Sequence, residues 1–334
     1  MKFGSVPISE AEGAILAHSL RVGGRRLRKG VTLTPDHLAK LRQEGIGEVV
    51  IARPGPEDIH EDEAAERLGR ALVAAGDDLR VERTAAFTGR VNLLARVPGV
   101  ARIDAAKIEA FNRLDPMVTC ATVPPLTRME QGGMIATVKI ISYAVPERAV
   151  AAAEALAQGG VGLHPVALKT ASLIVTETGA SPEGESGLRA IRTRLELLGI
   201  DLVETLVVPH RIDPIGAAIG QAQGEMILIL TGSATSDPFD VGPEGLRRAG
   251  GEVTRFGMPV DPGNLLFLGT FSGRSVLGLP GCARSPALNG ADWVLERLAC
   301  GLTVSSDDIA GMGVGGLLKE IPQRPQPRRG KPKK

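Results

Sequence analysis

Three loops in the second half of the chain carry the residue types that could do chemistry. They have the sequences TGSATSDPFD (residues 231–240), DPGN (261–264) and GLPGCARSP (278–286). The first and third loops each follow an apolar, strand-like run and precede a helix-like run. Small residues let backbone N–H groups approach a ligand, and the start of a helix attracts negative charge. These loops therefore predict a site for an anion or a phosphate at the carboxyl end of a sheet.

The first loop offers both hydrogen-bond donors and carboxylates. Its candidate ligand-binding residues are Gly232, Ser233, Thr235 and Ser236. Asp240 has two interpretations: it could contact a ligand or a metal ion, or it could cap the helix that follows. Asp237 adds negative charge that would repel a phosphate, which favours either a nearby divalent cation or altered chemistry.

The second and third loops add a tight turn, a thiol and a cation. The turn Pro262-Gly263 and its neighbour Asn264 are candidates for contact with a ligand. The third loop contributes a mixed set of candidates, namely Pro280, Gly281, Cys282, Arg284 and Ser285. Cys282 is either a thiol whose pKa is lowered by a helix dipole or a small buried residue. Ser285, followed by a proline, predicts the start of a helix.

The order and spacing of these loops resemble the molybdopterin-binding domain of molybdenum cofactor biosynthesis. This MoaB/Mog-like domain also occurs in molybdopterin molybdotransferases, and the resemblance covers residues 165–304 clearly. It implies a phosphate-bearing pterin dithiolene held across the strand ends, to which molybdate is delivered together with Mg2+. Loop amides and hydroxyls would hold the phosphate. Asp240 would organise the metal step, with Asp237 beside it.

The chain departs from the family pattern at several positions. Asp261 and Asn264 stand where the pattern has cations. His210 stands where the family has a carboxylate after the second strand, and Glu177 could substitute for the acidic residue expected after the first. These differences leave three functions open. The chain could be a molybdotransferase-like enzyme, a carrier, chaperone or sensor for the finished cofactor, or a nucleotide-binding enzyme that uses the same loops for a diphosphate.

Alternating strand and helix signals predict an α/β fold for residues 165–304. Strands are expected at 171–176, 201–208, 226–230, 252–257, 265–270 and 274–279. Helices are expected at 184–198, 213–222, 243–249 and 286–299. Strands that alternate with helices indicate a doubly wound, mostly parallel sheet, and Ser272-Gly273 predicts an antiparallel hairpin within it.

Residues 1–160 predict a smaller α+β region, divided into 1–53 and 54–160. Thr34 and Pro35 predict the start of a helix with Leu38 and Leu41 on its buried face, followed by a strand at 46–52. Helices are expected at 60–75, 104–113 and 146–158, the last as a bridge between domains. A strand is expected at 133–142, and a loop with a short helix near 87–96. Residues 305–334 are expected to form a glycine-rich linker and a disordered, basic, proline-rich tail.

Composition limits the classes of partner. The formal net charge is +1, but six of the 39 basic residues lie between Arg324 and Lys334, which leaves 33 basic residues against 38 acidic ones. This acidic body and the scarcity of aromatic residues argue against nucleic acid. Three widely spaced cysteines argue against a zinc site or a disulfide framework, and no apolar run is long enough for a membrane span. We expect a cytoplasmic homo-oligomer whose partners are the pterin and molybdoenzymes or other cofactor-biosynthesis proteins.

Overall fold

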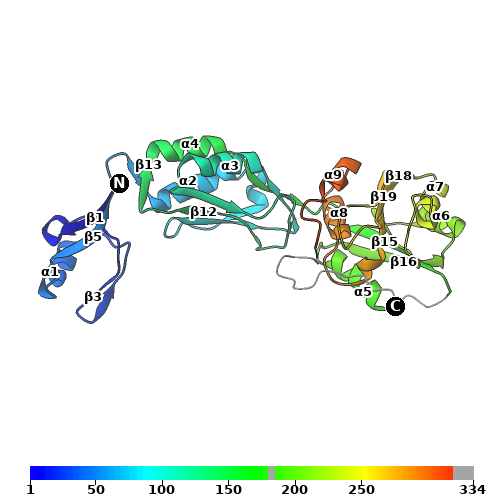
Figure 1. The fold of residues 1–334 in the computed structure, drawn as a ribbon, viewed down its shortest axis with the longest axis horizontal. Coiled ribbons are helices and arrows are strands. Elements are labelled where there is room, and N and C mark those ends of the chain that lie inside the picture. Colours follow the sequence, from blue (N-terminus) through cyan, green and yellow to red (C-terminus); the bar gives the residue numbers. More distant parts are fainter. Residues whose placement is uncertain (180–184, 319–334) are drawn as a thin grey trace, which may run out of the picture. The chain divides into compact units, whose positions relative to one another are not determined.

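The computed structural model describes residues 1–179 and 185–318 (Figure 1). The chain divides into unit 1, residues 1–97 and 101–164, and unit 2, residues 98–100 with the chain from Pro165 onward. The division falls where the alternation of strands and helices is expected to begin. The basic tail, residues 319–334, lies outside the described residues.

Residues 1–53 form a small part of unit 1 that we call the N-terminal module. Its elements are β1 (Lys2–Pro7), η1 (Ile8–Glu10), β2 (Ile15–Leu16), β3 (Leu20–Val22), β4 (Arg25–Leu27), α1 (Pro35–Gln43) and β5 (Glu48–Arg53). The sheet order is β1-β5-β2, and β3 pairs with β4 as a separate hairpin. Thr34 caps α1, and Leu38 and Leu41 are buried, as the sequence predicts.

The rest of unit 1 packs helices against an antiparallel sheet. Its elements are β6 (Asp58–His60), α2 (Glu61–Leu72), η2 (Asp77–Leu79), β7 (Val81–Arg83), β8 (Arg90–Ala95), β9 (Gly99–Ile103), α3 (Ala105–Leu114), β10 (Val118–Thr122), β11 (Arg128–Met129), β12 (Met134–Ile140), β13 (Ala144–Pro146), α4 (Glu147–Ala157) and β14 (Val161–Pro165). The sheets have the orders β10-β12-β8-β7, β11-β9-β14 and β13-β6. Figure 1 shows α2, α3 and α4 along one side of the sheet that contains β12.

Two predictions for this region are wrong. Residues 90–95 form β8 rather than a loop and short helix, because Val91, Leu93 and Ala95 alternate with less buried positions and enter the core. The helix expected as a bridge between domains is α4. It packs against α2 and α3 and buries Val150 and Ala153 in the core of unit 1.

Unit 2 is an α/β domain. Its elements are β15 (Thr170–Glu177), α5 (Glu185–Glu196), β16 (Asp201–Pro209), α6 (Ile212–Gln221), β17 (Met226–Leu230), α7 (Val241–Arg248), β18 (Glu252–Phe256), β19 (Phe267–Phe271), β20 (Arg274–Leu279), η3 (Gly281–Arg284), α8 (Gly290–Ala299) and α9 (Ser306–Gly311). The sheet order is β16-β15-β17-β20-β19-β18. Neighbours are parallel from β16 to β20, whereas β19 is antiparallel to both β18 and β20. The predicted α/β fold with a mostly parallel sheet and an antiparallel hairpin is confirmed.

The two faces of this sheet bury two separate sets of apolar side chains. On β17, Ile227 and Ile229 pack with residues of α6 and α7, whereas Met226, Leu228 and Leu230 pack with residues of α5 and α8. Every residue of β17 is buried because both faces are covered by helices. Helices on both faces leave the carboxyl ends of the strands as the natural place for a ligand.

Two boundaries in unit 2 differ from the prediction. The last long helix, α8, begins at Gly290 and not at residue 286, because Asn289 and Asp292 form the capping box. Ser285 is extended, a conformation favoured for the residue before a proline. Part of the expected glycine-rich linker is helix α9, and the backbone N–H of Leu318 donates to Asp261 O at 2.9 Å.

No helix in the described part of the chain is both long enough and apolar enough to cross a bilayer.

Candidate functional site

The loops that the sequence singles out lie at one edge of the sheet of unit 2. β15, β16, β17 and β20 are parallel, so the loops that follow them leave the sheet at the same edge. β18 runs in the same direction, because it is antiparallel to β19, which is antiparallel to β20. The second loop, after β18, therefore joins the first and third loops there. We call this edge the loop edge.

Thr176, at the end of β15, connects two of these loops. Its side chain is fully buried, and its Oγ1 lies 2.8 Å from His210 Nδ1. The same oxygen accepts a hydrogen bond of 2.8 Å from Gly232 N. A Cβ at Gly232 would lie 2.4 Å from Thr176 O, so only glycine allows this close approach. The structure thus brings two of the predicted site residues, His210 and Gly232, together at Thr176.

His210 and Glu177 occupy different positions relative to the loop edge. His210 N donates to Glu177 O at 2.9 Å, so the backbones of β15 and the loop after β16 are joined. The side chain of Glu177 is exposed at the end of β15, whereas His210 is half-buried. His210 is close enough to Asp240 to affect its titration. The histidine is therefore the nearer of the two to the first loop.

Asp240 caps helix α7 and also closes the first loop on itself. Its Oδ1 accepts from Val241 N at 2.7 Å, and its Oδ2 accepts from Ser236 N at 2.9 Å. Burial alone would raise the pKa of Asp240. The two amides and the charge of His210 outweigh burial and hold that pKa below its usual value. The capping interpretation therefore describes the structure, and contact with a ligand stays a prediction.

The remaining candidates of the first loop divide into supporting and accessible residues. Thr235 is buried, and its Oγ1 lies 3.3 Å from Thr231 Oγ1, so it supports the loop from within. Asp237 Oδ1 accepts from Phe239 N at 2.8 Å and fixes the turn. Ser233 and Ser236 are exposed, and the hydroxyl of Ser236 donates to Asp240 Oδ2 at 3.4 Å. Ser233 is therefore the serine of this loop best placed to meet an anion.

The third loop is joined to the first by a guanidinium. Arg284 Nη2 donates to Thr231 O at 2.6 Å. Of the other candidates, Gly281 is exposed, Cys282 and Ser285 are half-buried, and Pro280 is buried. The loop therefore brings one cation and one thiol to the loop edge.

Arg194, on α5, is a supporting residue that the sequence argument missed. Its Nε forms an ion pair with Asp292, and both side chains are largely buried. Its Nη1 donates to Ala283 O at 2.9 Å, and its Nη2 donates to Ser285 O at 2.9 Å. This one side chain holds the third loop against the start of α8. The sequence did contain a signal for this role. Arg194 lies three residues after Ile191, which places a basic side chain on the apolar side of the predicted helix.

The second loop supports α8 more than it faces solvent. Pro262 and Gly263 are buried, and Gly290 N donates to Pro262 O at 2.8 Å. A Cβ at Gly263 would lie 2.8 Å from Gly290 N. Asn264 is exposed, and its Nδ2 donates to Met258 O at 3.4 Å. Of the predicted residues in this loop, Asn264 is the accessible one.

A cleft of about 540 Å³ opens beside His210, between the starts of α6 and α7. Arg211 and Val241 line it, and Asp213 in its wall forms an ion pair of 2.9 Å with Arg248. The first turns of two helices face this space, and helix starts favour anions. The cleft extends the polar surface of the loop edge.

The donor set does not form a ready metal centre. In residues 1–179 and 185–318, no group of three or more His, Cys, Asp or Glu side chains is placed to hold a metal ion. Both oxygens of Asp240 already accept backbone N–H groups. The residues present therefore do not fit the Mg2+ that the resemblance implies.

The other two thiols lie away from this chemistry. Burial raises the pKa of Cys120 to about 12 and that of Cys300 to about 11. Both therefore stay protonated near neutral pH and act as small core residues. Cys282 is the half-buried cysteine, and it lies in the third loop.

Family models match two parts of the chain. Residues 184–299 match a model described as a probable molybdopterin binding domain. Residues 5–53, which make up most of the N-terminal module, match a model described as a domain of unknown function. No curated protein matches the chain.

Several solved structures are similar to the chain at low identity. The MoeA protein of molybdopterin biosynthesis from Pyrococcus horikosii is 15% identical, with 90% of this chain and 76% of that chain covered and a TM-score of 0.32. MoaB from Thermus thermophilus is 19% identical, with 46% and 100% covered and a TM-score of 0.27. A structure of MogA is 22% identical, with 40% and 91% covered and a TM-score of 0.26. TM-scores this low support no assignment, whereas the family model shows that residues 184–299 are similar to a probable molybdopterin binding domain.

Proposed function

We propose that the protein binds molybdopterin at the loop edge of unit 2 and serves molybdenum cofactor biosynthesis. The supporting observation is that loops from four strands are tied together there. Thr176 connects the end of β15 to His210 and Gly232, and Arg284 connects the third loop to Thr231. The family match covers the same elements. A preorganised edge of this kind holds a ligand without the entropic cost of ordering each loop on binding.

The phosphate of the pterin would be held by the first and third loops. Ser233 and Ser236 are exposed residues of the first loop, and the guanidinium of Arg284 brings positive charge to Thr231, where that loop begins. Asp237 and Asp240 add negative charge in the same loop, but each is engaged with backbone N–H groups. We therefore assign the serines and Arg284 to phosphate binding, and the carboxylates to shaping the loop.

The finer proposal is that bound molybdopterin receives molybdate at this edge, as in a molybdotransferase. The protein would act by holding the dithiolene and the oxyanion close together, since positioning alone can lower a barrier substantially. Asp240 beside His210 is the pair of titratable groups nearest the first loop. In this proposal Thr176, whose Oγ1 lies 2.8 Å from His210 Nδ1, positions the imidazole to contact an oxygen of molybdate, and Asp240 acts through its charge at the start of α7.

A carrier without turnover is the second candidate function. In the second loop, Asp261 and Asn264 occupy positions where basic side chains would attract molybdate. Of these two residues, Asn264 is exposed and Asp261 is half-buried. A site that binds the pterin but attracts molybdate weakly suits a carrier better than an enzyme. Both functions share the pterin site and differ in what happens after binding.

The test supplies the purified chain with adenylylated molybdopterin and molybdate. Active cofactor is measured by reconstitution of an apo-molybdoenzyme. For an enzyme, Asp240→Asn should lower the rate by about 100-fold, the usual scale for losing a preorganised electrostatic group. The asparagine keeps a side-chain oxygen that can cap α7. Asp201→Asn, at the opposite end of β16, is the matched control.

The outcomes separate the two candidates. A carrier should bind molybdopterin saturably and return it unchanged, with the same result for both variants. If molybdopterin does not bind at all, measured by calorimetry at micromolar concentrations, both functions fail.

A further inference from the structure

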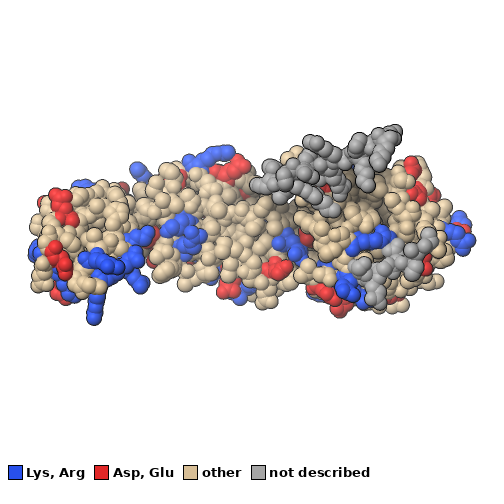
Figure 2. Space-filling model, turned by 60° about the horizontal axis from the view of Figure 1, so that its bottom comes forward, with Lys and Arg blue, Asp and Glu red and all other residues tan. Residues whose placement is uncertain are grey.

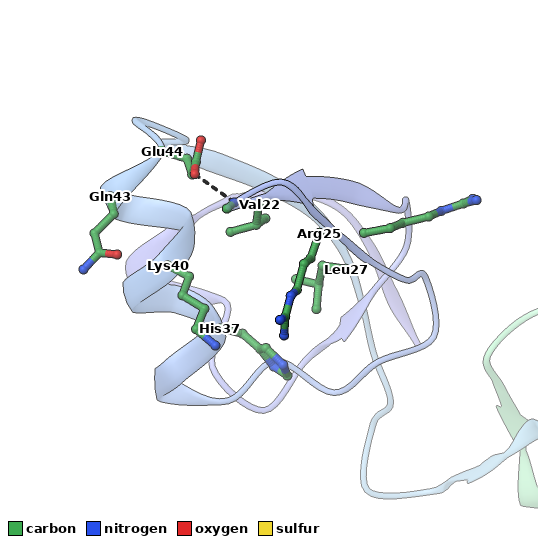
Figure 3. Close-up of a pocket in the computed structure, with 9 residues that line it drawn as sticks. Val22, Arg25, Leu27, His37, Lys40, Gln43 and Glu44 are labelled. Atoms are coloured by element: carbon green, nitrogen blue, oxygen red, sulfur yellow. Dashed lines mark hydrogen bonds between the residues drawn. The ribbon is translucent and has the colours of Figure 1, made fainter.

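The N-terminal module contains a pocket to which the function above gives no role. It has a volume of about 380 Å³ and lies between the β3–β4 hairpin and α1 (Figure 3). Val22 and Leu27, both half-buried and packed on the core of the module, provide apolar surface within it. A concave site with apolar surface and a few polar groups is the usual form of a small-molecule site.

Cations from two different elements converge on this pocket. Figure 3 shows Arg25 reaching from the hairpin toward α1, where Lys40 and His37 lie. Neither Arg25 nor Lys40 has an ion-pair partner among residues 1–179 and 185–318. Basic side chains gathered in a cleft raise the local concentration of anions, so the convergence of Arg25 and Lys40 favours an anion.

Three other polar side chains of the lining, Arg26, His37 and Glu44, have hydrogen-bond partners. Arg26 Nη2 donates to Ser19 Oγ at 3.4 Å. Thr34 N lies 3.3 Å from His37 Nδ1 in the cap of α1, which leaves the other ring nitrogen for the pocket. Glu44, the acidic residue of the lining, accepts a hydrogen bond of 2.8 Å from Gly23 N at the hairpin turn. Its charge is thereby held at the turn, while Arg25 and Lys40 remain for a ligand.

The charge of the surrounding surface agrees with this interpretation. Residues 21–29 carry five basic side chains and no acidic one. Figure 2 shows Lys and Arg side chains standing out from the N-terminal module, with Asp and Glu side chains elsewhere on the same face. Arginine and lysine are the side chains that bind phosphate, arginine through two parallel hydrogen bonds.

We propose that this pocket binds a small phosphate-bearing ring compound. The phosphate lies between Arg25 and Lys40, and the ring lies on Val22 and Leu27. The hairpin strands are three residues long, or roughly 10 Å at the usual rise. This is too short for an extended acidic peptide, whereas the volume suits one small molecule. A nucleoside monophosphate and a phosphorylated pterin share the required chemistry.

The experiment uses the full chain and the Cε1–H NMR signal of His37, assigned by its loss in His37→Gln. The probes are inorganic phosphate, AMP, neopterin phosphate and a hexaglutamate peptide. We expect saturable shifts with AMP or neopterin phosphate at affinities about 10-fold above that of phosphate, because the ring adds apolar contact. The tighter of the two identifies the source of the ring.

Matched double variants test the assigned cations. Arg25→Gln with Lys40→Gln should weaken binding by about 10-fold or more, since each removes a charge-assisted hydrogen bond. Arg28→Gln with Arg42→Gln removes the same net charge from the module outside the pocket, and should change affinity by less than about 2-fold.

Four results would overturn the proposal. These are equal losses in the two double variants, equal affinity for phosphate and the ring compounds, tighter binding of the peptide, and absence of any saturable shift. Because the readout is His37 in unit 1, failure here leaves the proposed function of unit 2 untouched.

Discussion

At the scale of single residues, Thr176 is the side chain on which the candidate site most depends. It is buried, and one oxygen atom serves both His210 Nδ1 and Gly232 N. Thr176→Val keeps the shape of the side chain but leaves the N–H of Gly232 without its acceptor. The free energy of unfolding should fall by about 1–3 kcal/mol, the usual cost of an unsatisfied buried donor. Urea unfolding measures this change.

The same variant should weaken molybdopterin binding by about 10-fold, because the first loop and His210 lose their common anchor. Thr176→Ser keeps the hydroxyl and is the matched control, with affinity close to that of the natural protein. If Thr176→Val lowers stability and leaves the affinity for molybdopterin unchanged, the contacts of Thr176 with His210 and Gly232 stabilise the fold and do not position the site.

Local sequence patterns predict some of these residues and cannot predict others. Asp240 stands directly before a predicted helix, where aspartate is a favoured cap, so both of its interpretations could be drawn from the sequence. The contacts of Thr176 span 34 and 56 residues along the chain, so no local pattern reports them. Burial of Thr235 and Pro262 likewise depends on packing between loops, which the spacing of residue types does not contain.

At the scale of elements, Arg194 joins α5, the third loop and α8. Its guanidinium pairs with Asp292 and donates to the carbonyl groups of Ala283 and Ser285. Arg194→Met removes the cation from a largely buried pair and leaves a carboxylate without compensation. Unfolding of unit 2 should become easier by about 3–5 kcal/mol. Circular dichroism during urea unfolding provides the measurement.

Arg192→Met is the control on the same helix, because Arg192 is exposed. A change within about 0.5 kcal/mol is expected there. Similar losses for the two variants would mean that α5 tolerates no methionine, and the role given to Arg194 would be rejected.

The elements themselves were predictable where apolar periodicity is strong. β17 is apolar at every position and α5 repeats apolar residues at helical spacing, so both were predicted close to their observed bounds. The start of α8 was misplaced because two caps compete within a few residues. Ser285 precedes a proline, whereas Asn289 has the reciprocal partner Asp292 that completes a capping box. The box satisfies more backbone donors, and the helix begins there.

At the scale of the whole molecule, the two units have separate hydrophobic cores. The core clusters of unit 1 contain residues 8–51 and 64–163, and those of unit 2 begin at Ala171. In the sequence, the alternation of strands and helices is expected from about residue 165, and unit 2 contains the chain from Pro165 onward. The pocket of the N-terminal module was not predicted. It depends on Arg25 and Lys40 meeting across a hairpin and a helix, which only the folded chain brings together.

Separate cores predict that molybdopterin stabilises one unit alone. A ligand present at about 100 times its Kd adds about 2.7 kcal/mol to the unfolding free energy of the part that binds it. Amide hydrogens of β17 and α8 exchange only when unit 2 opens, so their exchange should slow by about 100-fold. Amides of β8 and α2 in unit 1 should exchange at unchanged rates. Hydrogen exchange followed by mass spectrometry measures both sets in one sample, with inorganic phosphate at equal concentration as the control. Slower exchange in β8 and α2 would contradict a pterin site confined to the loop edge, whereas unchanged exchange everywhere would contradict the site itself.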